Sequence, residues 1–388
     1  MSALPEVERR ARLTLARLVE PGSWPVHDAV QRAGAAEVVA ALREGRQAPG
    51  LSAALVDAAQ ARAAGVDPDL DLRALSDCGA RLVCPGDGEW PDARLTWSRR
   101  SSQLSAPPLA LLVRGRPALD TTVERSVALV GARAASAYGE HVAGELAAGL
   151  SDAGVSVVSG GAYGIDGAAH RGALASGRAP TVAVLACGVD VAYPRGHDRL
   201  LGRIAEHGLL VSEHPPGVTP TRVRFLVRNR LIAALSRGTV VVEAALRSGS
   251  LSTAGRARDL LRPVMAVPGP VTSALSAGCH ALLRRDEGDE PAELVTGCRE
   301  VLAAVSPVGE HDAAPLRGAD RARDALPELV RAVLEAVPVR DGAGEAAVAR
   351  AAGVPVLSVQ QVLPSLLVAG LVERCETGWR LTPLGAGR

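Results

Sequence analysis

A nine-residue basic run holds the chain's only phenylalanine. The run, Arg222-Val-Arg-Phe-Leu-Val-Arg-Asn-Arg230, carries four arginines and no acid, and Phe225 lies near its middle. From Arg222 to Arg262 there are nine arginines and two acids, whereas the whole chain has a net charge of +1. Guanidinium groups neutralise phosphates, and an aromatic ring gives a base a face to stack on. The run is therefore a candidate site for single-stranded nucleic acid, and the alternative is a solvated basic helix face.

Composition limits how much weight the arginines can carry. The chain has 388 residues, no lysine, 47% hydrophobic residues and only 2% aromatic ones. A codon bias toward arginine explains the missing lysine as well as a function would, so the positions of the arginines matter more than their number. The length predicts two or three domains, and the core must consist mainly of Ala, Val and Leu.

The cysteines and apolar runs bear on the cellular compartment. Six cysteines are scattered without a C-x-x-C pair, which predicts reduced thiols and neither a disulfide framework nor a metal site. No apolar run is as long as a bilayer span, and the amino terminus is charged and lacks an apolar signal segment. We expect a cytoplasmic protein with no cofactor, no metal and no membrane contact.

Six short apolar runs indicate the elements that would position the basic run. Each is bounded by Gly, Ser or Pro, and most are separated by helix-length segments. Unbroken apolar runs predict strands that are buried on both faces. The chain should thus form an α/β fold with a Rossmann-like, doubly wound, mainly parallel sheet. The expected strands are Val127–Val130, Val155–Val158, Thr181–Leu185, Leu209–Val211, Thr239–Val242 and Val264–Val267.

Further segments flank this sheet. Residues 1–75 have helical periodicity and predict a small helical module, followed by a Rossmann-like domain at 76–298 with its core at 125–285. Residues 299–323 mix Pro, Gly and charge, which predicts a linker.

The last segment, residues 324–388, predicts a winged-helix domain of three helices and a hairpin that turns at Thr377-Gly378. Its expected recognition helix, Leu357–Ala369, offers Ser and Gln side chains but no positive charge. A groove-binding helix normally presents basic or several polar side chains to DNA, so this one favours a protein contact or an accessory role.

Loops at the carboxyl ends of the strands are the expected ligand site of a parallel sheet. Arg133 follows the first expected strand, Ser159-Gly160-Gly161 follows the second, and Ser248-Gly249-Ser250 precedes a helix. Glycines let backbone N–H groups approach a phosphate, and a helix amino terminus adds positive potential. These loops and the basic run predict a phosphate-binding rim. Dinucleotide binding is disfavoured, because Gly131-Ala-Arg-Ala-Ala-Ser136 replaces the Gly-x-Gly-x-x-Gly fingerprint.

Ordered motifs within residues 125–285 closely resemble those of the DprA/Smf family of DNA-processing proteins. The helical start and the winged-helix end agree with longer members of that family. Leu226 stands where the family commonly has proline, and Gly278-Cys-His280 where it usually has Gly-x-Asn. The matching motifs are Ser126–Arg133, Ser159–His170, Ala183–Pro194, Ser212–Gly217, Phe225–Arg230, Val242–Ala254 and Ala266–Gly269.

The resemblance implies a non-enzymatic mediator of DNA-mediated transformation. Such a protein binds incoming single-stranded DNA, protects it and loads the RecA recombinase. A homodimer formed through the Rossmann-like domain is implied as well. Taken with the residue pattern, the expected DNA-binding residues are Arg133, Ser159, Gly160, Gly161, Arg222, Phe225, Arg228, Asn229, Arg230, Ser248, Gly249 and Ser250.

Individual roles within this set can be stated. Arg133, Arg228 and Arg230 are expected to reach phosphate in one pocket. Asn229 would bind either a base edge or a loop backbone, and Phe225 would either stack on a base or pack in the core.

Three other residues are expected to support the site structurally. Asp166 and His170 are four residues apart at a helix start, which places them on one helix face. No nucleophile or metal set accompanies them, so Asp166 is interpreted as the helix N-cap with His170 oriented nearby. Glu243 ends a buried strand beside the arginines and should form an orienting ion pair.

Two other functions compete with this interpretation. One is a nucleotide-processing enzyme of the lysine-decarboxylase-like phosphoribohydrolase type, but its Pro-Gly-Gly-x-Gly-Thr-x-x-Glu element does not occur in the sequence. The other is a regulator that binds duplex DNA through the winged helix.

Overall fold

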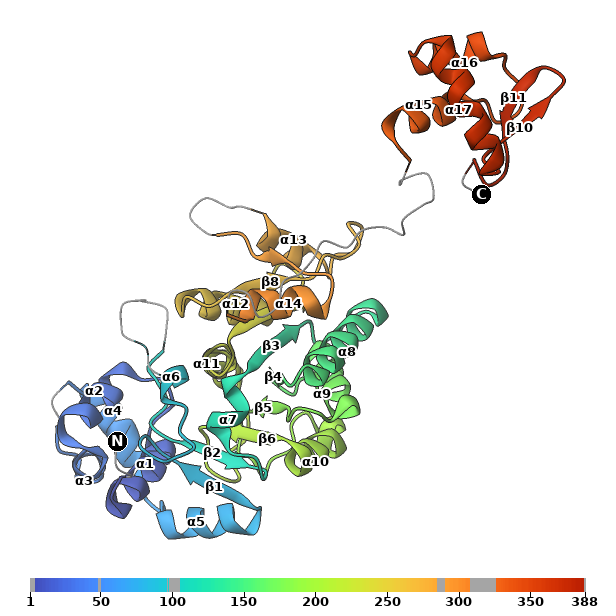
Figure 1. Ribbon diagram of the computed structural model, residues 1–388. Helices are drawn as coiled ribbons and strands as arrows, with labels where there is room; N and C mark the ends of the chain where they lie inside the picture. Colours follow the sequence, from blue (N-terminus) through green and yellow to red (C-terminus); the bar gives the residue numbers. More distant parts are fainter. Residues whose placement is uncertain are drawn as a thin grey trace. The chain divides into compact units, whose positions relative to one another are not determined.

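The computed structural model describes residues 4–47, 50–95, 97, 105–284, 290–307 and 326–386 (Figure 1). The chain divides into two compact units, residues 1–313 and residues 314–388. The larger unit contains amino-terminal helices and a mixed sheet, and the described part of the smaller unit contains three helices and a hairpin.

A nine-stranded sheet, in the order β1-β2-β6-β5-β4-β3-β7-β8-β9, organises the described part of the larger unit. The pairs from β6 to β9 are parallel, whereas β1 and β2 join one edge in antiparallel fashion. The six expected strands correspond to β3–β8, so the prediction of a doubly wound, mainly parallel sheet is confirmed. The strands are β1 (Ala80–Val83), β2 (Leu111–Arg114), β3 (Ser126–Gly131), β4 (Ser156–Ser159), β5 (Val182–Val184), β6 (Leu209–Ser212), β7 (Gly238–Glu243), β8 (Val264–Ala266) and β9 (Glu293–Leu294).

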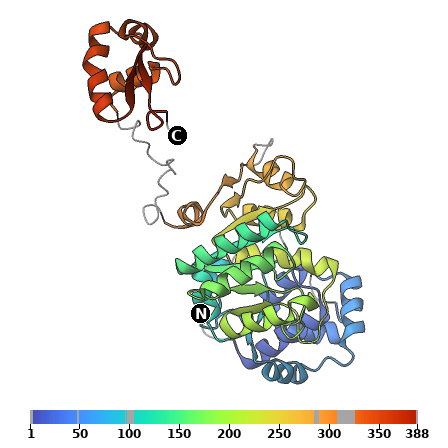
Figure 2. The ribbon, with the colours of Figure 1, turned by 90° about the vertical axis from the view of Figure 1, so that its right-hand side faces the viewer.

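Alternate side chains of β3 enter two hydrophobic layers, one on each face of the sheet. Val127 and Leu129 pack with α8 (Ala137–Asp152), α9 (Ile165–Ser176) and α14 (Cys298–Val305). Ala128 and Val130 pack with α11 (Arg222–Ala234) and α12 (Gly249–Asp259). These two helices cover the other face of the sheet (Figure 1). Figure 2 looks onto the green helices from α8 to α10 (Asp198–His207). Both faces are covered, as a parallel sheet requires.

The amino-terminal residues are helical, as predicted for 1–75. Helices α1 to α4 enclose a small core of their own. Leu13 and Leu75, however, pack in one cluster with Leu112 of β2 and Leu210 of β6. The core of these helices therefore continues into the sheet. The helices are α1 (Glu6–Leu18), α2 (Trp24–Ala33), α3 (Ala35–Arg43), α4 (Ala53–Ala63) and α5 (Pro68–Asp77); the short helices of this unit are α6 (Asp92–Leu95), α7 (Leu119–Glu124), η1 (Arg195–His197) and α13 (Ala277–Leu283).

The expected linker begins too early. It was predicted from residue 299, but Cys298–Val305 forms α14. Val301 and Leu302 are buried against the sheet, because apolar residues recur there at helical spacing. Residues 308–323 of the predicted linker lie outside the described residues.

The smaller unit contains the elements expected of its sequence. Helices α15 (Glu328–Ala336), α16 (Glu345–Ala352) and α17 (Val356–Val368) pack around one core with the antiparallel strands β10 (Val372–Cys375) and β11 (Gly378–Leu381). Because Cys375 pairs with Gly378, the hairpin turns at Glu376-Thr377, one residue earlier than predicted. The winged-helix assignment of this unit stays a prediction.

No single described helix is long and apolar enough to cross a bilayer, and α16 and α17 qualify only as a pair bent by 105°. Apolar side chains of both helices, including Val348 and Val359, are buried in the core of the unit.

Helix α11, which carries the basic run, is capped at both ends. At its start the Thr221 hydroxyl accepts a hydrogen bond from the Arg224 N–H. At its end the guanidinium of Arg262 donates to the carbonyl oxygens of Ala233 (2.6 Å), Ala234 and Ser236 (2.5 Å). A cation at the carboxyl end satisfies carbonyls that have no partner within the helix and favours the helix dipole. Arg262 is thus a structural residue, and burial lowers its pKa to about 10.

Replacing Arg262 tests this capping. The Arg262→Met variant leaves several carbonyl oxygens at the end of α11 without their donor, so we expect its unfolding free energy to fall by about 1–3 kcal/mol. Urea unfolding measures the change. Arg178→Met is the matched control, because Arg178 is 74% exposed and has only a 3.7 Å ion pair with Asp152. Equal stability of the two variants would contradict the capping role.

Candidate nucleic-acid interface

The chain reverses its direction of travel across the sheet between β3 and β7. From β3 the chain builds β4, β5 and β6 on one side, and it then crosses back through α11 to place β7 on the other side. Ligands of open α/β sheets bind outside the carboxyl ends of the strands at such a switch point. A cavity of about 850 Å³ lies there, lined by residues 130–134 at the end of β3, by Ala245 and residues 247–250 between β7 and the start of α12, and by residues of α11. We call it the switch-point cavity.

Most of the predicted site residues come together in this cavity. The glycine loop after β4 and Arg230 of α11 do not line it. Its predicted members are Arg133, Arg222, Phe225, Arg228, Asn229, Ser248, Gly249, Ser250 and Asp166, and the predicted residues that do not line it are Ser159, Gly160, Gly161, Arg230, His170 and Glu243.

The Phe225 ring faces the cavity. It is half-buried and belongs to none of the hydrophobic clusters of the described residues. The centroid of the Phe225 ring is 5.4 Å from the centroid of the Tyr193 ring. The guanidinium carbon of Arg133 lies 4.7 Å from the Phe225 centroid. The ring thus borders the cavity, and the guanidinium of Arg133 over it is favourably placed against the π-system.

Arg228 forms the floor of the cavity and is only 5% exposed. Its Nη1 donates to the carbonyl oxygen of Val184 at 2.5 Å, while Nε has no hydrogen-bond partner among the described residues. Burial lowers the pKa of Arg228 to about 10, with the nearby Asp166 carboxylate opposing the shift. The side chain therefore stays cationic at neutral pH. Through Nη1 the guanidinium joins α11 to the end of β5.

Gly160 makes room for this guanidinium. A Cβ at residue 160 would lie 2.1 Å from Arg228 Nη1. Gly161 has a φ of +69°, and the buried Ser159 hydroxyl donates to the Leu129 carbonyl at 2.6 Å. The Ser159-Gly160-Gly161 loop thus serves the packing of Arg228. It does not line the switch-point cavity, and its predicted part in DNA binding stays a prediction.

Asp166 lies beside Arg228 but is not the helix N-cap. Gly164 occupies that position, and Asp166 is the second residue of α9. Its carboxylate accepts a hydrogen bond from the Ala162 N–H at 3.4 Å. Burial raises the pKa of Asp166, against the influence of Arg228. The N-cap prediction was wrong because the chain enters the helix through a positive-φ glycine, which the spacing of Asp166 and His170 does not reveal.

The amino terminus of α12 forms another wall of the switch-point cavity. Ser248 is its N-cap, and the Ser248 hydroxyl lies 2.7 Å from that of Ser250. A base edge or a loop backbone was predicted as the partner of Asn229. In the structure its side-chain amide donates to the backbone carbonyl of Gly249 at 3.3 Å. This contact joins α11 to the start of α12.

Acids from distant segments neutralise two of the four arginines in the basic run. Arg224 binds both carboxylate oxygens of Glu20, at 3.0 and 2.8 Å, in the segment between α1 and α2. Arg230 is 1% exposed and binds Glu213 at 2.8 Å. The prediction that Arg230 points into the DNA pocket was wrong, because its partner follows β6 and is not visible in the local sequence.

Glu243 and His170 also have structural roles. Glu243, however, does not have the arginine partner that was predicted for it. Glu243 accepts hydrogen bonds from the Ser136 N–H (2.8 Å) and hydroxyl (2.7 Å) at the start of α8, in place of the expected ion pair with arginine. His170 is fully buried, with Nδ1 2.8 Å from the Thr181 hydroxyl. That hydroxyl donates to Val157, so His170 Nδ1 must donate. Burial lowers the His170 pKa to about 3 and keeps the ring neutral.

The cavity contains further residues that the sequence did not single out as site members. Arg247 follows β7 and is exposed, and Tyr193 contributes the second ring. Both stand in loops after strands, which is the signal that could have found them.

Comparisons with known proteins agree with this geometry. Residues 81–306 match the family described as DNA recombination-mediator protein A. A Mycobacterium tuberculosis protein, provisionally named DNA processing protein DprA, is 50% identical over 323 residues, which are 82% of this chain and 81% of that protein. The DNA processing protein DprA of Streptococcus pneumoniae is 43% identical over 202 residues, or 52% of this chain and 68% of that protein.

A solved structure extends the comparison to the fold. The X-ray structure of DprA from Streptococcus pneumoniae is similar with a TM-score of 0.61 and 32% identity, and covers 79% of this chain and 99% of that chain. The chain therefore belongs to the DprA/Smf family of DNA recombination mediators.

The contact between Gly160 and Arg228 gives a direct test of the site's architecture. In Gly160→Ala the new methyl group would force the buried guanidinium from its place, so we expect the unfolding free energy to fall by about 1–3 kcal/mol. Gly202→Ala in α10 is the control, since a Cβ there meets open space and an alanine favours the helix. Chemical unfolding of both variants should separate them, and equal stability would contradict the proposed packing.

Proposed function

We propose that this chain binds single-stranded DNA in the switch-point cavity and acts as a recombination mediator. The observation that carries the proposal is the half-buried Phe225 ring, surrounded by cations within one cavity. Arg133, Arg222 and Arg247 are exposed there, and none forms an ion pair with another described residue. Phosphates would bind the arginines, and a base would stack on the ring.

The position of the ring favours a single strand over a duplex. Stacking on Phe225 requires a base whose face is free, whereas bases in a duplex are stacked on their neighbours. The α12 amino terminus in another wall of the cavity, with Ser248 and Ser250, supplies polar groups and positive potential for a phosphate.

The proposal includes the roles that the family resemblance implies. The chain would protect incoming strands in the cytoplasm, load RecA onto them and act as a homodimer. The relatives' name, DNA processing protein, supports a task in DNA processing. RecA loading and the dimer rest on the resemblance.

A binding role is favoured over an enzymatic one by how the buried polar groups are used. Glu243 caps α8, His170 bonds Thr181, and Asp166 holds a loop beside Arg228. Each candidate acid or base near the cavity therefore has a structural partner. Within the described residues there is no cluster of three His, Cys, Asp or Glu side chains suited to a metal ion.

An oligonucleotide titration tests the proposal. Fluorescence anisotropy of labelled oligothymidine, of a duplex of equal length and of a nucleoside monophosphate would be measured with the full chain. We expect preference for the single strand and a logarithmic salt slope of about −0.7 per neutralised phosphate. Preference for the duplex would support the winged-helix regulator, and release of a free base from the monophosphate would support the phosphoribohydrolase. Repeating the titration with RecA present tests the loading role.

The cavity arginines should carry the salt dependence. In Arg133→Gln we expect affinity for oligothymidine to fall roughly fivefold at about 0.1 M salt, and the slope to become shallower by about 0.7, because one phosphate contact is lost. Anisotropy over a range of salt concentrations measures both quantities. Arg178→Gln, which removes a surface arginine outside the cavity, should leave both unchanged.

Two further variants test the arginines of the basic run that are paired with acids. Glu20→Gln frees Arg224 and should raise affinity and steepen the slope. Arg230→Met should instead lower stability by about 3–5 kcal/mol, because it leaves Glu213 buried without its partner. A loss of DNA affinity from Arg133→Gln no larger than that from the control would remove the phosphate role.

Phe225→Ala should behave differently from the arginine variants. We expect affinity to fall by about 1–3 kcal/mol with the salt slope unchanged, because stacking releases no counterions. Thermal unfolding should change little, since the ring lies outside the described hydrophobic clusters. The two measurements are made on the same preparation. Unchanged affinity would rule out stacking, and a stability loss of about 3–5 kcal/mol would show that the ring is a core residue.

A further inference from the structure

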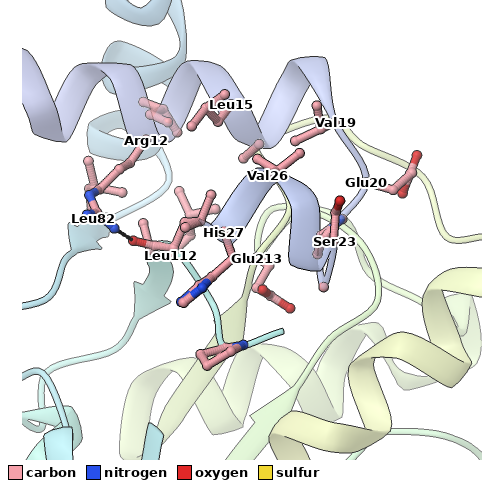
Figure 3. A pocket seen from close by; sticks show the side chains of 17 residues that line it. Arg12, Leu15, Val19, Glu20, Ser23, Val26, His27, Leu82, Leu112 and Glu213 are labelled. Atoms are coloured by element: carbon pink, nitrogen blue, oxygen red, sulfur yellow. Dashed lines mark hydrogen bonds between the residues drawn. The ribbon is translucent and has the colours of Figure 1, made fainter. Parts of the chain in front are cut away.

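A second cavity lies between the amino-terminal helices and the sheet (Figure 3). Its volume is about 40 Å³. Figure 3 shows Arg12 of α1, His27 of α2 and Glu213 after β6 around it, with Leu15, Val26 and Leu112 as apolar wall. It is distinct from the switch-point cavity, with which it shares no lining residue. We call it the junction cavity.

Two residues that line the junction cavity, Arg12 and His27, each have a buried nitrogen atom without a hydrogen-bond partner among the described residues. Seven buried side-chain polar atoms have no hydrogen-bond partner among the described residues, and four of them belong to Arg12, His27 and Arg230. Arg12 and His27 line the cavity, and Arg230 binds Glu213, which also lines it. Buried polar groups are normally satisfied, so a concentration of donors at one place indicates a ligand with acceptor oxygens.

The charges at the junction cavity are not balanced by the protein. Arg12 and Arg230 are 7% and 1% exposed, and Glu213, 7% exposed, binds Arg230. Among the described residues, Arg12 donates only to the Leu109 carbonyl, at 2.6 Å. The nearby Glu8 carboxylate instead accepts from the backbone N–H groups of Ala35 and Ala36. One buried positive charge thus has no ion-paired acid, and a buried charge without a counter-charge is costly.

The other ionisable groups at this cavity do not change the balance. Glu20 lines it but binds Arg224. His27 Nδ1 lies 3.8 Å from the carboxylate of Asp28, which is 38% exposed. Burial lowers the pKa of His27 against the influence of Asp28, so its ring is neutral at neutral pH and can donate one hydrogen bond.

We propose that the junction cavity binds a small aliphatic carboxylate, whose oxygens accept hydrogen bonds from Arg12 and His27. A volume of about 40 Å³ holds about three water-sized groups, which suits a carboxylate with a very short tail. The tail would lie against Leu15 and Val26. The ligand supplies the missing negative charge and bridges α1, α2 and the sheet, so its binding stabilises the larger unit.

Acetate is the probe for this proposal, with the full-length chain and sodium chloride at equal ionic strength as the reference. At ten times its Kd, acetate should raise Tm by about 2 °C above the chloride value. Arg12→Met removes the cation, and Ala16→Leu fills the cavity while keeping the charge. Both should abolish the acetate effect. Arg73→Met on the exposed side of α5 is the control that should retain it.

A direct contact measurement decides the case even if a variant fails to fold. In the methyl-labelled wild type, intermolecular nuclear Overhauser effects should connect the acetate methyl with those of Leu15 and Val26. Their absence overturns the proposal. An equal Tm rise with chloride shows charge screening only and overturns it as well. Persistence of the acetate effect in both Arg12→Met and Ala16→Leu places the carboxylate elsewhere and has the same consequence.

Discussion

The buried guanidinium of Arg228 is the constraint on which the switch-point cavity depends. It joins α11 to the end of β5 through the Val184 carbonyl, lies beside Asp166, and fills the space that Gly160 leaves. A buried cation requires acceptors and a nearby counter-charge, so the loop after β4 and the start of α9 must assume the positions that provide them. With Arg228 held in this way, the ring of Phe225 one turn earlier on α11 faces the cavity.

Helix α11 has two faces with different electrostatic roles. Arg222, Phe225 and Asn229 face the cavity, whereas Arg224 and Arg230 bind acids. These acids come from distant segments: Glu20 lies between α1 and α2, and Glu213 follows β6. The protein therefore sorts a uniformly basic run into cations that can meet a ligand and cations that hold the helix. Arg262, whose guanidinium caps the carboxyl end of α11 from a distant part of the sequence, is a third structural cation.

The amino-terminal helices belong to the same arrangement. Leu13 and Leu75 share a hydrophobic cluster with strands β2 and β6, so a division at residue 75 cuts through a packed core. Periodicity could predict that residues 1–75 are helical, because each helix has its own apolar stripe. It could not predict where that stripe packs, because the partners of Leu13, which include Leu112 of β2 and Leu210 of β6, are distant in the sequence.

The sequence by itself determined the doubly wound sheet, the loops at the carboxyl ends of its strands, and the placement of Arg133, Phe225 and Ser248 around one cavity. These follow from local patterns: apolar runs make buried strands, and the carboxyl ends of parallel strands meet at one edge. Only the tertiary structure decided which arginines remain available. Arg228 and Arg230 are two residues apart, yet one forms the cavity floor and the other is paired with Glu213. Likewise, Glu243 binds Ser136, not an arginine. Hydrogen bonds and ion pairs are decided by atoms a few ångströms apart in space, and the partners here are distant in sequence.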